Sequence, residues 1–185
     1  MTEAESSNSN SNEKQTVLKL QDMDIVFREE INKLPGCDKL MLCFQCGTCT
    51  ADCPVGRHVE EYNPRKIAAM TKLGLKNKLF SGDLLWLCTG CYTCLERCPQ
   101  NVKLAEIISN LKGVAVREGF LHPAFKKVVE ALAEHGYIYE ITEFIDEERE
   151  TLELPPAPKV NIGEVRKIMI RAGLDELIGI ELKED

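Results

Sequence analysis

The sequence lacks an excess of positive charge and any long apolar run. Its 30 acidic residues outnumber its 23 basic ones, which gives a formal net charge of −7. Recognition of a nucleic-acid backbone requires a basic patch or stripe, so nucleic acid is not expected as a partner. Charged residues interrupt every apolar stretch before it reaches the ~20 residues of a membrane-spanning helix, so we expect no membrane anchor.

The N-terminus lacks the features of a targeting signal. Residues 1–15 are polar and rich in Ser and Asn, with neither the apolar core of a secretion signal nor the arginines of a transit peptide. We therefore expect a cytoplasmic protein. The low-complexity run Ser6–Asn12 offers no apolar surface to offset the entropy of ordering, so residues 1–20 are predicted to be disordered.

Motifs for nucleotides and catalytic metals are also missing. The chain has no G-x-G-x-x-G for a dinucleotide, no G-x-x-x-x-G-K-[ST] for a nucleotide phosphate and no H-E-x-x-H for a catalytic metal. The three histidines have no spacing that suggests a ligand set, and His122 and His135 are interpreted as helix-end residues. What remains to be explained is the chain's nine cysteines.

Apolar residues at helical spacing predict a mostly α-helical body. Asn63 and Pro64 are typical of a helix start, because Asn caps the first turn and Pro suits its first position. Only Tyr137–Ile141 resembles a strand. The predicted helices run from Asp24 to Leu34, from Asn63 to Gly74, from Ser81 or Asp83 to Leu87, from Val102 to Arg117, and from His122 to Gly136.

Beyond Gly136 the sequence has the character of an extension outside the core. An acidic run, Asp146–Glu150, precedes the stiff, extended spacer Pro155–Pro158. Apolar residues between Val165 and Leu177 then predict a final helical piece. A permanent subunit uses such an extension to bind its neighbours, whereas a free electron carrier rarely needs one.

One internal repeat contains eight of the nine cysteines. Residues 40–54 align with residues 85–99, and each copy reads C-x-x-C-x-x-C-x-x-x-C-P. Bacterial-type ferredoxins hold [4Fe-4S] clusters with this run, and its fourth cysteine ligates the other cluster. The spacing therefore predicts two clusters that cross-link the two runs. One is expected on Cys43, Cys46, Cys49 and Cys98, and the other on Cys88, Cys91, Cys94 and Cys53.

Structural disulfides and zinc ribbons are the other interpretations of these cysteines. A cytosolic chain keeps its thiols reduced, and tightly spaced C-x-x-C pairs suit metal better than cystine. Zinc sites need four ligands in all, whereas each run here supplies four by itself and ends in Cys-Pro. Both alternatives fit the sequence less well than two iron-sulfur clusters.

Two further features lie outside the repeat. Cys37 precedes the first run and is interpreted as a buried small hydrophobic residue. A modest basic stretch separates the two runs. It is interpreted as a solvated helix face, with a docking surface for an acidic partner as the alternative. The stretch comprises Arg65, Lys66, Lys72, Lys76 and Lys78.

Two such runs separated by a helical insertion resemble the α-helical ferredoxin family. This family includes the iron-sulfur subunits of succinate dehydrogenase, anaerobic glycerol-3-phosphate dehydrogenase and heterodisulfide reductase. The strings Cys43–Pro54 and Cys88–Cys94 most resemble the heterodisulfide reductase C subunits of methanogenic archaea. The resemblance covers roughly residues 37–139 and implies an α-helical domain with two [4Fe-4S] clusters between its helices.

The resemblance also implies partners and a function in methanogenesis. It implies that an A subunit with flavin and iron-sulfur groups bifurcates electron pairs, the C subunit relays one branch, and the catalytic B subunit reduces the coenzyme M–coenzyme B heterodisulfide. A hydrogenase or formate dehydrogenase is a further partner in the larger complex. The chain would then be a non-catalytic subunit of an oxidoreductase, with residues 21–136 as the two-cluster domain and residues 137–185 as a partner-binding extension.

Two alternative functions remain open on the sequence. The chain is either an iron-sulfur relay subunit of another dehydrogenase or reductase, of the glycerol-3-phosphate dehydrogenase or fumarate reductase type, or a free-standing ferredoxin. The sequence lacks the paired Cys-Cys-Gly segments of the catalytic B subunit, any flavin site, and the [2Fe-2S] domain of the succinate dehydrogenase subunit. These absences favour a heterodisulfide reductase C subunit.

Overall fold

The computed structural model describes residues 18–183. Within that range all regular elements are helices and no strand occurs, so the predicted mostly α-helical class is confirmed. The disorder predicted for residues 1–20 concerns residues outside the described range, apart from Leu18, Lys19 and Leu20. No helix between residues 18 and 183 is both long enough and apolar enough to cross a membrane.

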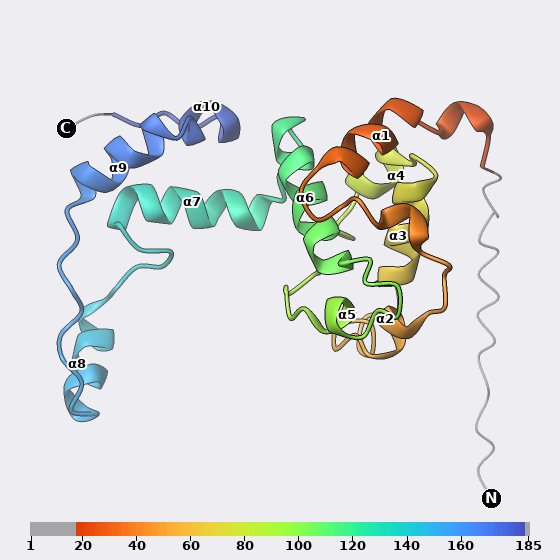
Figure 1. The fold of residues 1–185 in the computed structure, drawn as a ribbon. Helices are drawn as coiled ribbons and strands as arrows, with labels where there is room; N and C mark the ends of the chain where they lie inside the picture. The colour runs from red at the N-terminus through yellow and green to blue at the C-terminus, as the bar shows by residue number, and fades with distance from the viewer. Residues whose placement is uncertain (1–17, 184–185) are drawn as a thin grey trace, which may run out of the picture.

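The cysteine-bearing part of the chain folds into six helices (Figure 1). Two short 3₁₀ turns, Leu20–Asp22 and Leu40–Leu42, lie before the first cysteine run. The helices are α1 (Ile25–Lys33), α2 (Thr48–Ala51), α3 (Pro64–Lys72), α4 (Lys76–Phe80), α5 (Thr93–Glu96) and α6 (Leu104–Arg117).

Local sequence explains where the longer helices begin. Asp24 caps α1, where its side chain accepts a hydrogen bond of 2.9 Å from the Phe27 amide. Asn63 caps α3 in the same way, accepting from the Lys66 amide at 3.0 Å, and Pro64 occupies the first helical position. The predicted starts of α1 and α3 are thus confirmed, as is the helix predicted over residues 102–117.

Helices α1, α3, α4 and α6 enclose one apolar core. Ile67 of α3 and Ile107 of α6 are fully buried within it. Phe27 and Phe80 pack edge to face with ring centroids 5.5 Å apart, which joins α1 to α4. Gly74 allows the close approach of α1, because its φ is +70° and a β-carbon there would lie 2.2 Å from the Asp24 carbonyl oxygen.

Two predicted elements are wrong. The short helix lies at Lys76–Phe80 and not at residues 81–87. Residues 81–87 form bends and turns instead, and the Asp83 carbonyl accepts a hydrogen bond of 2.8 Å from the Trp86 amide. Tyr137–Ile141 forms bends and loop rather than a strand. A strand needs a neighbour to pair with, and within residues 18–183 none is present.

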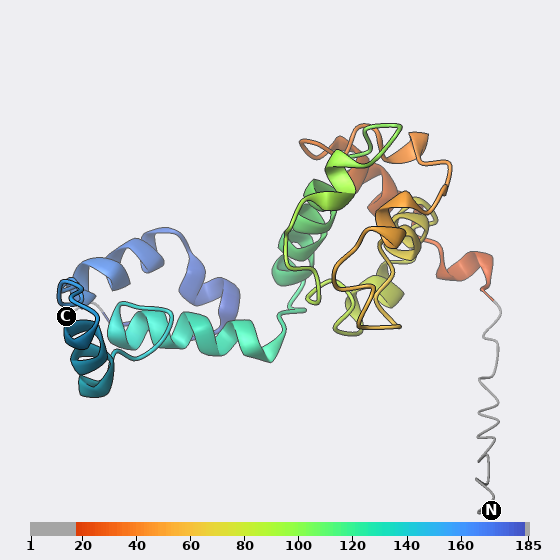
Figure 2. The same ribbon diagram turned by 90° about the horizontal axis from the view of Figure 1, so that it is seen from below.

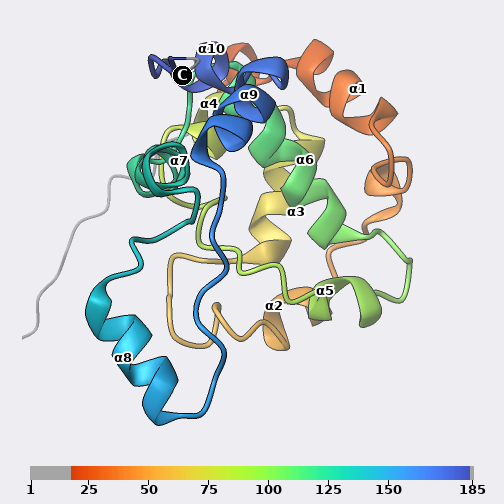
Figure 3. The ribbon, with the colours of Figure 1, turned by 90° about the vertical axis from the view of Figure 1, so that its left-hand side faces the viewer.

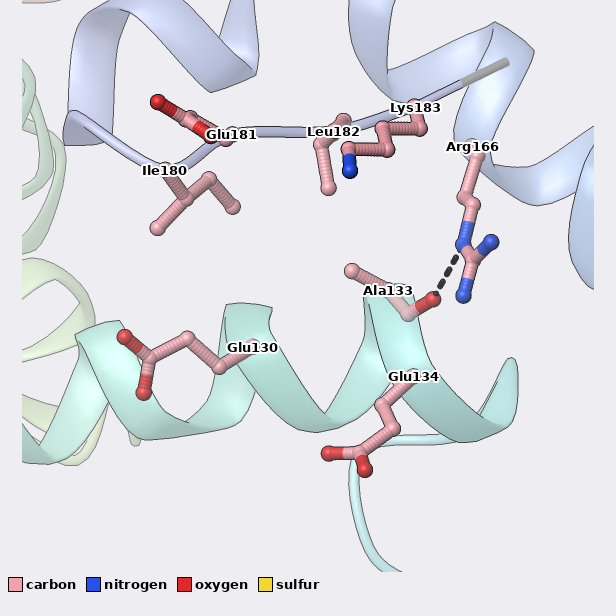
Figure 4. A pocket seen from close by; sticks show the side chains of 8 residues that line it. All are labelled: Glu130, Ala133, Glu134, Arg166, Ile180, Glu181, Leu182 and Lys183. Carbon is pink, nitrogen blue, oxygen red and sulfur yellow. Dashed lines mark hydrogen bonds between the residues drawn. The ribbon is translucent and has the colours of Figure 1, made fainter. Parts of the chain in front are cut away.

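Four helices follow α6, and the last three of them lie in residues 137–185, the predicted extension. Helix α7 packs against α9, where Arg166 Nε donates to the Ala133 carbonyl at 2.9 Å (Figure 4). Helix α10 contacts α6, and Figure 2 shows the extension as a lobe beside the cysteine-bearing domain. The predicted final helical piece is two helices. The four are α7 (Pro123–His135), α8 (Glu143–Thr151), α9 (Ile162–Arg171) and α10 (Leu174–Ile178).

Candidate metal centres

Each cysteine run folds into the same loop followed by a short helix. The residue two positions after the first cysteine has left-handed backbone in both copies, with φ of +63° at Gln45 and +67° at Gly90. The residue before α2 and α5 is left-handed as well, with φ of +90° at Gly47 and +61° at Tyr92. These turns reverse the chain and direct the first three thiols of each run towards a common space.

Two small hollows, with empty volumes of about 360 and 320 Å³, collect the cysteines of both runs. Each hollow is lined by the first three cysteines of one run and the fourth cysteine of the other. The first hollow is lined by Cys43, Cys46, Cys49 and Cys98 and also by Cys94, and the second is lined by Cys88, Cys91, Cys94 and Cys53. Apart from Cys94 in the first hollow, these are the two groups of cysteines that the sequence repeat pairs.

The two hollows are neighbours. Helix α2 contacts α5 (Figure 1). Cys94 lines both hollows. Within residues 18–183, no three His, Cys, Asp or Glu side chains converge on the position of a single metal ion. The thiols instead line the hollow at separate positions, as is required when each thiolate binds a different iron atom of a cubic cluster.

The second thiol of each run lies at the surface beside a hydroxyl group. Cys46 and Cys91 are exposed, and their Sγ atoms lie 3.4 and 3.5 Å from the hydroxyl oxygens of Thr48 and Thr93. These hydroxyls are the main cause that lowers the pKa of each thiol. A hydroxyl that stabilises the thiolate favours the form that binds iron.

The third thiol of each run is more buried. Desolvation raises the pKa of Cys49, and it raises the pKa of Cys94 to about 12. Burial also raises the pKa of the Tyr62 hydroxyl, which lines the second hollow. Because iron ligation requires thiolates, a metal cluster must displace the protons of these thiols when it binds.

Amide groups donate to the fourth thiol of each run. The Gly56 amide donates to Cys53 Sγ at 3.4 Å, and the Val102 amide donates to Cys98 Sγ at 3.3 Å. Such N–H···S hydrogen bonds offset the negative charge of a cluster bound by four thiolates. Each hollow holds the four cysteines of one predicted ligand set, with one amide directed at a sulfur, and this arrangement fits a [4Fe-4S] cluster.

Two lysines that the sequence analysis did not place at the site contact the cysteine runs. Lys72 Nζ donates to the Cys43 carbonyl at 2.7 Å, and Lys112 Nζ donates to the Cys88 carbonyl at 2.9 Å. The interpretation of the basic stretch as a solvated face is thus wrong for Lys72, because a long side chain at the end of α3 can turn inward to a carbonyl that needs a donor.

The signal for this lysine pair is present in the sequence. When α3 and α6 are aligned at their first residues, Pro64 and Leu104, Ile67 matches Ile107 and Lys72 matches Lys112. The repeat alignment misses the match because the linker after the fourth cysteine is longer in the first copy, residues 54–63, than in the second, residues 99–103.

Arg65 of the basic stretch lines the first hollow, whereas Cys37 and the histidines lie outside both hollows. Cys37 is fully buried, as predicted, and Asn110 Nδ2 donates to its Sγ at 3.4 Å. Desolvation is the main cause that raises the pKa of this thiol. His122 caps α7 by accepting from the Ala124 amide at 3.1 Å, and His135 is the last residue of α7, as expected of helix-end residues.

A further hollow lies in the extension, between α7 and residues 180–183, and contains no cysteine (Figure 4). Glu130, Glu134 and Glu181 line it together with Arg166 and Lys183. It is separate from the two cysteine-lined spaces.

Comparison with known proteins identifies the family of the cysteine-bearing domain. The 4Fe-4S dicluster domain family matches residues 39–102, which include both runs. The presence of two [4Fe-4S] clusters is thereby supported by the family, the cysteine count and the hollows.

Three curated relatives match most of the chain, and each is the C subunit of a heterodisulfide reductase. The chain is 38% identical to the C subunit of the H(2):CoB-CoM heterodisulfide,ferredoxin reductase of Methanothermobacter thermautotrophicus, over 89% of this chain and 91% of the relative. It is 32% identical to the iron-sulfur C subunit of the CoB–CoM heterodisulfide reductase of Methanopyrus kandleri, over 91% of this chain and 94% of the relative. It is 36% identical to the C subunit of the ferredoxin:CoB-CoM heterodisulfide reductase of Methanosarcina mazei, over 80% of this chain and 94% of the relative.

Proposed function

The chain belongs to the family of heterodisulfide reductase C subunits, and from this we propose that it relays electrons to the reduction of the coenzyme M–coenzyme B heterodisulfide. We propose that a flavin-bearing A subunit delivers the electrons and that the catalytic B subunit uses them. A hydrogenase or formate dehydrogenase would supply the larger complex. The chain itself is the iron-sulfur component. We propose that it is not the catalyst.

One observation carries this proposal: each hollow gathers three cysteines of one run and the fourth of the other. A [4Fe-4S] cluster, when bound, accepts and releases one electron at a time. The protein supplies four thiolates, amide donors to sulfur and a largely apolar wall. Because four thiolates occupy all four iron corners, no open coordination position remains for a substrate.

The iron content of the chain tests the cluster assignment. Protein produced anaerobically should contain about eight iron and eight acid-labile sulfide per chain, from two four-iron clusters. Elemental analysis and the broad sulfur-to-iron charge-transfer absorption measure both quantities. Zinc at one or two ions per chain, without that absorption, would contradict the assignment.

We propose the cytoplasm as the location, where thiols stay reduced.

We further propose that residues 137–185 bind a partner subunit. They hold 13 of the 30 acidic residues and 6 of the 23 basic ones, so they account for the whole net charge of −7. Helix α8 stands apart from the other helices (Figures 1 and 3) and is rich in acidic residues. Phe144 and Leu152 are 67% and 65% exposed there, which suits a partner groove that is apolar with a basic rim.

Combined replacement of Phe144 and Leu152 by alanine should weaken binding of the partner subunit by at least about tenfold, since exposed apolar anchors of this kind are the residues that dominate interfaces. Affinity is measured with separately produced A and B subunits, and iron content verifies that both clusters remain. Leu20→Ala removes an 86% exposed leucine at the other end of the chain and should change neither quantity. Unchanged affinity for both of these partners would refute a binding role for α8.

A further inference from the structure

Lys72 and Lys112 occupy equivalent positions in the two halves of the domain. Each lies eight residues after the first residue of its helix, α3 or α6. Each helix follows one cysteine run, and its lysine returns to the first cysteine of that same run. The internal duplication therefore extends from the cysteines to a matched pair of cations.

The contacts of the two lysines are specific. Each ammonium donates to the main-chain carbonyl of a cluster cysteine, at 2.7 Å for Cys43 and 2.9 Å for Cys88. Both side chains are partly buried. Within residues 18–183, neither lysine forms an ion pair with an acidic side chain, unlike Lys76, which pairs with Glu118 at 2.7 Å.

The electrostatic consequence follows from the charge of a cluster bound by four thiolates. Such a cluster is negative when oxidised and gains a further negative charge on reduction. A nearby cation without an acidic partner stabilises the reduced form more than the oxidised form, so it raises the reduction potential. Partial burial strengthens this effect, because water screens the charge less.

We propose that Lys72 and Lys112 tune the reduction potentials of the two clusters, each acting on the cluster held mainly by its own run. The inference rests on the proposed ligand assignment. The lysines are positioning and tuning residues rather than ligands: they fix the start of each cysteine loop through the carbonyl, and each adds a positive charge near its cluster. At the first cluster this charge is additional to that of Arg65, which lines the hollow.

The two sites differ in two respects. Arg65 also lines the first hollow, whereas no lysine or arginine within residues 18–183 lines the second. The second difference is an aromatic contact of Lys112. The ammonium of Lys112 also lies 5.9 Å from the centroid of the Trp86 ring, two residues before Cys88. Met41 holds the equivalent position before Cys43 and provides no aromatic face. Lys112 is therefore held by both a carbonyl and a cation–π contact, whereas Lys72 has the carbonyl alone.

The test is a redox titration of the cluster-loaded chain, monitored by electron paramagnetic resonance. Lys72→Met keeps most of the apolar stem and removes the charge. It should make one of the two couples about tenfold harder to reduce, which is a potential about 59 mV lower for one electron. Lys112→Met should shift the other couple in the same direction.

Three further variants separate the causes. Lys72→Arg keeps the charge and should retain most of the potential. Lys72→Gln keeps a donor for the carbonyl without the charge, and its potential should fall as in Lys72→Met. Lys78→Met removes an exposed lysine of α4 and should leave both potentials unchanged, which controls for net charge.

Iron analysis of each variant separates tuning from loss of a cluster. The proposal is overturned if both methionine variants retain eight iron and shift neither potential more than Lys78→Met does, or if both shift the same couple. A native potential in Lys72→Gln would also overturn it, because the hydrogen bond and not the charge would then set the value. Absence of two clusters from the unmodified chain would instead refute the ligand assignment.

Discussion

Replacing Cys91 with alanine should abolish heterodisulfide reduction by a complex that still assembles. Cys91 is the exposed second thiol of its run and lines the second hollow. Loss of an outer-shell partner of a metal site costs 10–100-fold in affinity or activity, so loss of a ligand should lower turnover by at least ~100-fold. The variant leaves residues 137–185, the proposed partner-binding extension, unaltered, so it should still bind the other subunits.

Reconstitution measures this effect. Heterodisulfide reduction is compared for the isolated chain, for the full set of subunits, and for the set that contains Cys91→Ala. Cys37→Ala is the matched control, because it removes a buried cysteine that lies outside both hollows, and it should retain turnover.

Two outcomes would contradict the relay function. The isolated chain should show no reductase activity, since thiolates close every iron corner. Turnover by the isolated chain would make it a catalyst in its own right. Undiminished turnover by an assembled Cys91→Ala complex that had lost its cluster would show that the second hollow is not on the electron path.

Replacing Cys98 with serine should damage the cluster of the first run and leave the cluster of its own run intact. Cys98 belongs to the second run in the sequence, yet it lines the first hollow with Cys43, Cys46 and Cys49. The Val102 amide donates to its sulfur at 3.3 Å, so replacement also removes that hydrogen bond to the ligand atom. Cys53→Ser is the reciprocal variant and should damage the cluster of the second run.

Electron paramagnetic resonance of each reduced variant, with iron content, distinguishes the two clusters. The signal lost in Cys98→Ser should be the one that persists in Cys53→Ser. Cys37→Ser should retain both signals. If Cys98→Ser and Cys88→Ser removed the same signal and left the other intact, the cross-ligation would be refuted.

Several features of the fold could be predicted because their causes are local. Asn63 and Pro64 specify the start of α3 by capping and by the fixed φ of proline, and Gly136 ends α7 with φ of +75°. The 3.6-residue spacing of Ile107, Ile108 and Leu111 predicts the buried face of α6. The position predicted for the short helix near residue 80 is wrong because several leucines and turn residues allow more than one register there.

By itself, the sequence determined which residues are the candidates to hold iron. The repeat of eight cysteines and two prolines defines two equivalent runs, and each predicted set of four cysteines lines one hollow, although Cys94 lines both and the ligand assignment stays a prediction. The mostly helical class and the extension beyond Gly136 also follow from local spacing and composition. These features depend on neighbours within a few positions along the chain.

Only the tertiary structure decided which distant groups meet the cysteines. Lys72 reaches Cys43 across 29 positions, and Lys112 reaches Cys88 across 24. The unequal linkers after Cys53 and Cys98 conceal this equivalence in a linear alignment. The direction of a lysine side chain depends on how its helix packs. The sequence therefore predicts a solvated face for Lys72 and makes no prediction for Lys112, whereas the fold directs both side chains to a cysteine run.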